Sequence, residues 1–271
     1  MTKDCPLTEY DLSQELISPR FEKLSLSLPS RALFVFLSEK AIRTFAEEKG
    51  GKEIGSFISI TKKFPLWEIP GEQPAVLMQA PVGGAMAVLM AERLFAYGTE
   101  KLLAAGCCGS LADLPENTFL LVEKALRDEG TSFHYLPPQR FVSLPENPRM
   151  KISAFLREEG IPFSPCTTWS TDGFFRETKE KLKQRREEGC TVVDMECASL
   201  AACAQFRNKD FAQILFTADT LAHLRHNQRG WGKESRGAAL EIGLRALPRS
   251  HSARTHCHLT HSFPPRMPSL H

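Results

Sequence analysis

The feature that most constrains the fold is a recurring unit: a short apolar run, a turn of small residues, and a segment with helical periodicity. The first unit begins with the nearly all-apolar run 31–38, which is typical of a strand buried on both faces. A helical segment over 39–49 follows and ends at Gly50-Gly51. The same succession predicts further strands over 53–61, 75–80, 102–105, 119–123, 163–169, 191–195 and 211–217. It predicts further helices over 83–97, 145–159, 177–188, 196–206 and 235–247.

Strands that alternate with helices favour an α/β fold. We expect a three-layer α/β/α sandwich with a twisted, mostly parallel central sheet. The 271 residues suffice for one large domain, which we place at residues 1–247. In such sheets, ligands bind where strands end and helices begin. The candidate site segments are therefore four strand exits, at residues 106–110, 169–175, 193–196 and 217–220.

The composition narrows the class of partner. A net charge of +2, with 24% charged residues, gives no reason to expect a nucleic-acid or membrane partner. The first residues lack the apolar core of a secretory signal, and no apolar run approaches the roughly 20 residues needed to cross a bilayer. We therefore expect a cytoplasmic protein. Its eight cysteines fit neither a disulfide framework nor a zinc site, so we expect reduced thiols.

The last segment, 248–271, differs from the rest of the chain. It holds five of the eight histidines among many Ser, Pro and Arg residues, and it has no apolar period. The histidine spacings fit no recognised metal site, so we expect a disordered tail rather than a metal-binding one.

The most informative segment is Asp194-Met195-Glu196, which follows an apolar strand and precedes a helix of small residues. A carboxylate at a strand exit can accept two hydrogen bonds from a diol such as the ribose hydroxyls. The methionine offers a polarizable apolar surface for a sugar or a ring. Spacing alone supports equally a second interpretation, in which Glu196 only complements the positive end of the following helix.

Asp-Met-Glu before a small-residue helix resembles the Glu-Met-Glu segment of the nucleoside phosphorylase superfamily. That family includes uridine and purine nucleoside phosphorylases and methylthioadenosine nucleosidases. The resemblance spans roughly residues 5 to 247, and an ordered set of segments is more specific than any single motif. The segments that carry it are Pro81–Ala85, Lys101–Ser110, Thr171–Phe175, Asp194–Glu196 and Phe216–Asp219.

The resemblance implies a role for each matching residue. Glu196 would bind the 2′ and 3′ hydroxyls of ribose, with Met195 beneath the sugar. Asp172 and one of Phe174 and Phe175 would bind the base, the ring by stacking, although a core position is the alternative for either ring. Asp219 would protonate a purine at N7 as it leaves, or else only cap a turn. Asp219 and Glu196 are thus the candidate catalytic residues.

The implied phosphate site is where the chain departs from the family. Phosphate would be cradled by Gly83, Gly84, Gly106, Cys107 and Ser110. The family's Gly-Asp-Pro-x-Arg turn is replaced by the segment 36–40, and its strand arginine by Ala104. A phosphate dianion without arginine loses its bidentate partner.

The resemblance therefore implies a pentosyltransferase of nucleoside salvage that releases a free base and ribose 1-phosphate. Two alternatives stay open: a nucleosidase that uses water, and a non-catalytic nucleoside-binding protein. No cofactor or metal is expected beyond phosphate as co-substrate, and His223 and His226 are interpreted as part of a flap. A Rossmann dehydrogenase and a serine hydrolase are disfavoured, because neither Gly-x-Gly-x-x-Gly nor Gly-x-Ser-x-Gly is present. Asp219 favours a purine, and family members are usually homo-oligomers, either dimers or hexamers.

Overall fold

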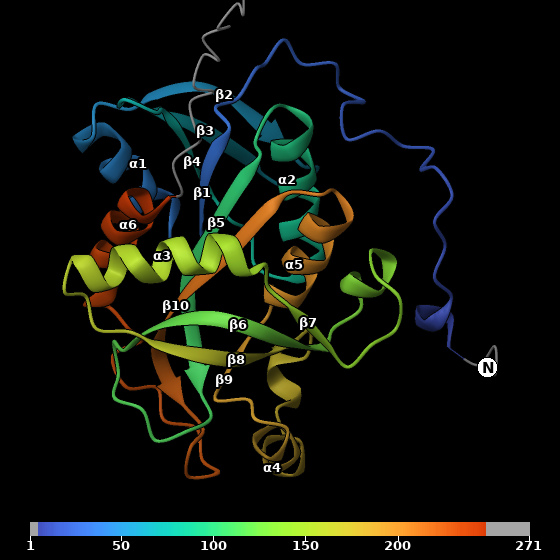
Figure 1. The fold of residues 1–271 in the computed structure, drawn as a ribbon, viewed down its shortest axis with the longest axis vertical. Coiled ribbons are helices and arrows are strands. Elements are labelled where there is room, and N and C mark those ends of the chain that lie inside the picture. The colour runs from blue at the N-terminus through green and yellow to red at the C-terminus, as the bar shows by residue number, and fades with distance from the viewer. Residues whose placement is uncertain (1–4, 248–271) are drawn as a thin grey trace, which may run out of the picture.

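The computed structural model describes residues 5–247, which form one sheet with helices on both faces (Figure 1). The predicted tail lies outside these residues. The strands are β1 (Arg31–Val35), β2 (Lys52–Ile58), β3 (Lys63–Ile69), β4 (Ala75–Gln79), β5 (Lys101–Ser110), β6 (Phe119–Asp128), β7 (Phe141–Ser143), β8 (Ser164–Thr171), β9 (Val192–Asp194) and β10 (Asp210–Thr220). The α-helices are α1 (Glu39–Glu48), α2 (Gly84–Ala96), α3 (Glu146–Glu158), α4 (Lys179–Glu187), α5 (Cys197–Phe206) and α6 (Ser235–Ala246). Three 3₁₀ turns are η1 (Pro6–Thr8), η2 (Thr131–His134) and η3 (Phe174–Arg176).

The sheet has two parts that share β5. In the first part, β1, β4, β3 and β2 extend from β5 in that order. In the second, β10, β6, β8 and β9 return to β5, and β10 also pairs with β5, so that these five strands close into a ring. The long strands β5 and β10 run side by side over almost their whole length (Figure 1). The closed ring brings the ends of β5, β9 and β10 together.

The layers are as predicted, but the strand directions are not. Five strand pairings are parallel and five are antiparallel, so the sheet is mixed rather than mostly parallel. Part of the difference comes from the predicted strand over 53–61, which is one arm of a β2–β3 hairpin with its turn at residues 59–62. Neither β3, which contains Pro65, nor the three-residue β7 was predicted. Hairpin strands are antiparallel, and proline in a run disfavours a strand.

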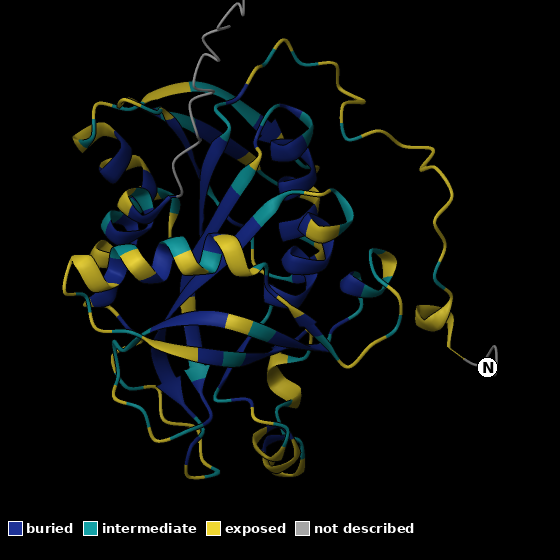
Figure 2. Ribbon diagram, in the orientation of Figure 1, coloured by how far each residue is buried: buried dark blue, intermediate teal, exposed yellow. Residues whose placement is uncertain are grey.

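Two groups of helices cover the two faces of the sheet. Helices α1, α3 and α6 share one apolar cluster with the sheet, which includes Phe45, Ile152 and Leu240. Helices α2 and α5 share the cluster on the opposite face, which includes Met90 and Leu200. The central strands β1, β4 and β10 between them are buried, whereas the edge strand β2 is mostly exposed or half-buried (Figure 2). No helix within residues 5–247 is long and apolar enough to span a membrane.

The turn between α2 and β5 depends on Gly98. Its φ of +128° lies in a region that L residues rarely adopt, and a Cβ there would lie 2.7 Å from the carbonyl oxygen of Leu28. The close approach is required because Leu28 donates its N–H to Tyr97 at the end of the helix, over 2.8 Å. Gly98 therefore allows the segment at Leu28 to pack against the turn that leads into β5, the strand that the two parts of the sheet share.

Gly98→Ala is expected to lower the free energy of unfolding by about 2 kcal/mol or more, because it adds both backbone strain and a backbone clash. Gly160→Ala is the matched control: its φ is +65°, but nothing lies within 4 Å of the added methyl group. That substitution should lower the free energy of unfolding by only about 1 kcal/mol. Urea unfolding of the two variants measures the difference, and equal losses would contradict a special role for Gly98.

Candidate active site

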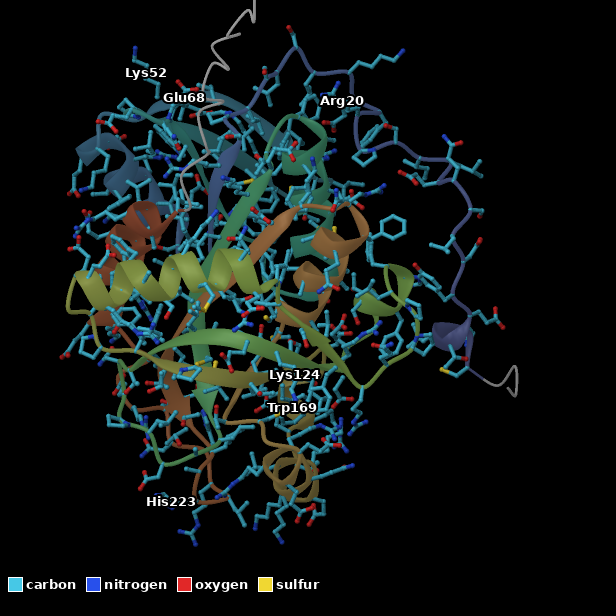
Figure 3. The ribbon with its side chains drawn as sticks, in the orientation of Figure 1. Arg20, Lys52, Glu68, Lys124, Trp169 and His223 are labelled. Atoms are coloured by element: carbon cyan, nitrogen blue, oxygen red, sulfur yellow. The ribbon has the colours of Figure 1, made fainter. Side chains whose placement is uncertain are left out.

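A cavity of about 170 Å³ lies where β5, β9 and β10 end. Residues from all four of the predicted strand exits line this cavity. In Figure 3, which draws the side chains, Trp169 marks β8 and His223 marks the loop that follows β10. The lining residues are Phe36, Val82, Cys107, Cys108, Gly109, Phe174, Glu177, Val193, Asp194, Met195, Glu196, Gln213, Asp219 and Trp231.

Asp194 is the buried anchor of this region. Its Oδ1 accepts hydrogen bonds from the hydroxyls of Thr168 at 2.9 Å and Ser170 at 2.7 Å, both on β8. Its Oδ2 accepts from the backbone N–H groups of Glu196 at 3.0 Å and Cys197 at 2.7 Å, at the start of α5. Asp194 therefore caps α5 and joins that helix to β8.

The contacts of Glu196 show that its side chain does not cap the helix that follows it. Glu196 occupies the N-cap position of α5 but makes no side-chain cap hydrogen bond there. Its Oε1 instead accepts the N–H of Gly83 over 2.7 Å, at the start of the other helix, α2. Glu196 is 7% exposed, and Met195 lies beside it in the cavity wall. One carboxylate oxygen of Glu196 is thus held by the start of α2, at the wall of the cavity.

The two acids affect each other's ionisation. Burial and the neighbouring charge of Asp194 raise the pKa of Glu196 to about 8, against the opposite effect of the Gly83 N–H. Burial also raises the pKa of Asp194, while its hydrogen bonds act to lower it. With four donors, Asp194 is the member of the pair that is better able to carry the charge. Hydrogen bonds from a bound diol would stabilise the charged form of Glu196 as well.

Asp219 lies at the exit of β10 and is 7% exposed. Its Oδ2 lies 3.1 Å from Nε2 of His226, so the two side chains form a hydrogen bond. The ring of His226 packs 6.0 Å from that of Trp231, which also lines the cavity. Gly109 makes this crowding possible, because a side chain there would meet both Val193 and the Asp219 carboxylate. Asp219 and His226 thus form an acid–imidazole pair at the cavity wall.

Glu177 is a site residue that the sequence reasoning missed. The sequence predicted that it belongs to a charged helix over 177–188 on the protein surface. Helix α4 begins two residues later, and Glu177 follows η3 at the cavity wall. Burial and the nearby Asp219 raise its pKa to about 7. Its position directly after the aromatic segment was the signal that could have identified it.

The residues expected to bind the base do not all reach the cavity. Phe174 lines it, whereas the neighbouring Phe175 is 93% exposed and belongs to neither the cavity nor the core. The two rings contact each other edge to face, with centroids 5.1 Å apart. Asp172 is exposed and accepts the N–H of Gly130 over 2.8 Å, which ties the end of β8 to the loop after β6. Only one of these three side chains faces the cavity.

The predicted phosphate cradle is used mainly for other contacts. Gly83 donates its N–H to Glu196, and a Cβ on Gly84 would overlap the Ser199 hydroxyl. A Cβ on Gly106 would lie 3.0 Å from Phe36, and the buried Ser110 hydroxyl donates to the backbone oxygen of Ala112 at 2.6 Å. Of the five predicted residues, only Cys107 lines the cavity.

A second cavity adjoins the first and has a different charge. Its volume is about 470 Å³, and it shares Phe36, Val82 and Cys107 with the first cavity. Two cationic side chains line it: Lys62 from the turn between β2 and β3, and Arg236 from the first turn of α6. Lys62 contacts the side chain of Gln79 and lies 3.5 Å from Glu39, while Arg236 donates to the Trp231 carbonyl at 3.1 Å. By contrast, no Lys or Arg within residues 5–247 lines the first cavity.

Comparison with known proteins identifies the class to which this fold and cavity belong. Residues 32–244 match the phosphorylase superfamily. The chain is therefore a member of that family. A curated relative, an uncharacterized protein of Acanthamoeba polyphaga mimivirus, is 24% identical over 152 residues. This match covers 56% of the chain and 59% of the relative, so the chain spans only about three-fifths of the relative's length.

Solved structures share the fold at low identity. AMP nucleosidase from Bacteroides thetaiotaomicron has a TM-score of 0.65 and 22% identity, with 81% of this chain and 87% of that chain covered. Purine nucleoside phosphorylase from Toxoplasma gondii, in complex with immucillin-H, has a TM-score of 0.69 and 18% identity, with 87% and 97% covered. Uridine phosphorylase from Vibrio fischeri has a TM-score of 0.68 and 17% identity, with 85% and 94% covered.

The raised pKa of Glu196 makes stability depend on pH. The pKa rises from 4.5 to about 8 on folding, so the folded state binds this proton more tightly than the unfolded state does. The free energy of unfolding should therefore fall as the pH rises from about 5 to about 8. Glu196→Gln should remove this loss, which amounts to roughly 1.4 kcal/mol per unit of pKa displacement.

Urea unfolding at both ends of that pH range, for wild type and Glu196→Gln, measures the effect. The difference in unfolding free energy, variant minus wild type, should increase with pH. Glu48→Gln, at an exposed position on α1, is the control and should follow the wild type at every pH. If the Glu196→Gln curve also runs parallel to the wild type, Glu196 is ionised in the folded protein at neutral pH.

Proposed function

We propose that this protein cleaves the N-glycosidic bond of a nucleoside by phosphorolysis and releases a free base and ribose 1-phosphate. The observation that carries the proposal is the convergence of Glu196, Phe174 and Asp219 on one cavity, from three separate strand exits. These groups have the chemistry to bind a sugar diol, a planar base and a departing base nitrogen, respectively. Membership of the phosphorylase superfamily supports the same reaction class.

In its ionised form, which hydrogen bonds from the sugar hydroxyls favour over the protonated form, Glu196 supplies the charge that this reaction needs at the sugar. As the bond from C1′ to the base nitrogen breaks, positive charge builds on the sugar ring. The free oxygen of Glu196 can accept hydrogen bonds from the sugar hydroxyls, while Gly83 holds its other oxygen in place. A fixed anion there stabilises the transition state more than the ground state.

The Asp219–His226 pair supplies the proton. The electron pair of the broken bond stays with the base, which leaves more readily once it is protonated. Asp219 lies at the cavity wall and His226 lies behind it, 3.1 Å away, so a proton held between them can pass to a base nitrogen. Phe174 provides a ring face for the same base.

The second cavity supports phosphate as the acceptor. An anion would be repelled from a cavity lined by four acidic side chains, Glu177, Asp194, Glu196 and Asp219. The adjoining cavity offers Lys62 and Arg236 instead, and it meets the first along Phe36, Val82 and Cys107. Phosphate bound there would form the new bond to C1′ from the side opposite the departing base.

Hydrolysis is the second candidate, and one observation favours it. The turn at Gly83 and the strand at Gly106, which the sequence assigned to phosphate, are occupied by Glu196 and Phe36. Base release from purine and pyrimidine nucleosides, measured by chromatography with and without phosphate, decides between the two. Phosphate-dependent release of ribose 1-phosphate supports phosphorolysis. Phosphate-independent release of ribose supports a nucleosidase, and absence of release would contradict glycosidic cleavage altogether.

Glu196→Ala is expected to lower kcat/KM for every cleaved nucleoside by about a hundredfold or more, because the anion beside the developing charge is lost. Unfolding measurements on the same variant show whether it is still folded. Glu48→Ala, at an exposed position that does not line the cavity, should leave kcat/KM unchanged. Near-normal turnover by Glu196→Ala would contradict the assignment of Glu196 to the active site.

Lys62→Ala and Arg236→Ala are each expected to raise KM for phosphate by about tenfold, because each removes a charged hydrogen-bond donor. The KM for the nucleoside should change much less. Lys63→Ala is the matched control, since the neighbouring Lys63 pairs with Glu53 at 3.1 Å and does not line the cavity. An unchanged phosphate KM in both variants would place the acceptor elsewhere.

A further inference from the structure

One carboxyl at the cavity is left without any partner. Asp194 accepts four hydrogen bonds, Glu196 accepts the Gly83 N–H, and Asp219 contacts His226. Glu177 lines the same cavity, yet within residues 5–247 its carboxyl makes neither a hydrogen bond nor an ion pair. Within residues 5–247, its oxygens are not among the buried polar atoms that lack a partner, so they are open to water or to a ligand in the cavity.

The position of Glu177 places it at the base rather than at the sugar. It follows η3, whose Phe174 ring also lines the cavity. It is close enough to Asp219 for the charge of that residue to raise its pKa. The proposed function assigns the ring face of Phe174 and the proton of Asp219 to the base. Glu177 therefore lies among the groups that would surround the base edge.

We propose that Glu177 is the specificity-determining residue for the base, and that its carboxylate accepts a hydrogen bond from the 6-amino group of a purine. This inference rests on the proposed function and names its substrate class: 6-aminopurine nucleosides. A carboxylate can only accept hydrogen bonds, so it favours an N–H group and repels a carbonyl oxygen. The first cavity offers no Lys or Arg within residues 5–247 that could pair with the carbonyl oxygens of a uracil or a 6-oxopurine.

Protonation of Glu177 gives the proposal a pH signature. Burial and Asp219 raise the pKa of this carboxyl to about 7. Above that pH the carboxylate accepts from a 6-amino group, and below it the protonated acid donates to a 6-oxo group instead. The ratio of kcat/KM for adenosine to kcat/KM for inosine should therefore rise about tenfold or more from pH 6 to pH 8.

Other titratable groups surround Glu177, and the ratio separates it from those that act on the sugar. The titratable side chains around it are Asp219 on β10, Asp194 and Glu196 at the exit of β9, Cys107 on β5, and His226 behind Asp219. On its own segment, Asp172 contacts the Gly130 N–H, and Arg176 precedes Glu177. Groups that act on the sugar affect adenosine and inosine alike, so their titration cancels in the ratio. Asp219 would lie beside the 6-substituent as well as N7, so the loss of the pH dependence in Glu177→Gln, and not the ratio alone, assigns the effect to Glu177.

The test is Glu177→Gln, which keeps the shape but offers both a donor and an acceptor at every pH. Its adenosine-to-inosine ratio should fall roughly tenfold at pH 8, as expected for the loss of one charged hydrogen bond, and should no longer change with pH. Glu180→Gln, at an exposed position in the first turn of α4, is the control and should keep the wild-type profile. A Glu177→Gln variant with the wild-type ratio and pH dependence would overturn the proposal.

A binding measurement tests Glu177 independently of whether the protein cleaves nucleosides. If the wild type cleaves no nucleoside, the proposed function fails, and calorimetry with adenine and hypoxanthine at pH 8 still tests Glu177. Tighter binding of adenine to wild type, weakened roughly tenfold in Glu177→Gln, would support recognition of the amino group. Equal binding of both bases, no binding of either, or equal affinity of wild type and variant for adenine would overturn it.

Discussion

The four hydrogen bonds that Asp194 accepts are the interaction on which the site depends. They join two hydroxyls of β8 to the first backbone N–H groups of α5, across the closed part of the sheet. The Ser170 hydroxyl also accepts the N–H of Ala198, so the start of α5 is satisfied without Glu196. Because Asp194 performs the capping, the Glu196 carboxylate is free to turn towards the cavity and the start of α2. Without Asp194, several buried donors would lose their acceptor.

The two adjoining cavities divide the charge in a way that suits two substrates. The acidic side chains lie in the first cavity, where a neutral nucleoside can donate hydrogen bonds from its hydroxyls and its base. The cationic side chains lie in the second, where an anion can bind without facing those acids directly. The wall between them is formed by Phe36, Val82 and Cys107, and Phe36 occupies the space beside Gly106. In the proposed phosphorolysis, charge separation of this kind would reduce the electrostatic cost of bringing phosphate close to Glu196.

The two parts of the sheet have different roles in holding the site. The open part carries α1 and the β2–β3 hairpin, which supplies Lys62. The closed ring sets the separation of Glu196 and Asp219, because β5 pairs with both β9 and β10. Gly109 on β5 leaves room for Asp219 and Val193 to approach. A ring of paired strands limits the relative motion of these acids more than loops alone would.

The sequence by itself determined the layers, most of the element positions and the segments that carry the site. Apolar runs followed by helical periodicity report local burial, and strand exits meet at one edge of a sheet. Strand exits gave the segments, and the resemblance to the phosphorylase family singled out Glu196, Met195, Phe174 and Asp219 within them; all four line the cavity. Their chemical roles belong to the proposed function.

Only the tertiary structure decided which partner each polar group has. Neither the cap that Asp194 makes for α5 nor the bond from Gly83 to Glu196 follows from spacing, because each joins segments that meet only through strand register and ring closure. The same holds for Lys62 and Arg236, which are far apart in the chain and line one cavity. Glu177 was predicted to belong to an exposed charged helix, because it continues the charged run of that segment. The helix begins only at Lys179, and Glu177 lies in the connection before it, whose contacts periodicity does not report. Asp172 and Phe175 were expected at the base because a motif assigns a whole segment to the site. The backbone turn at η3 decides which side chains of that segment face the cavity, and of the three only Phe174 does.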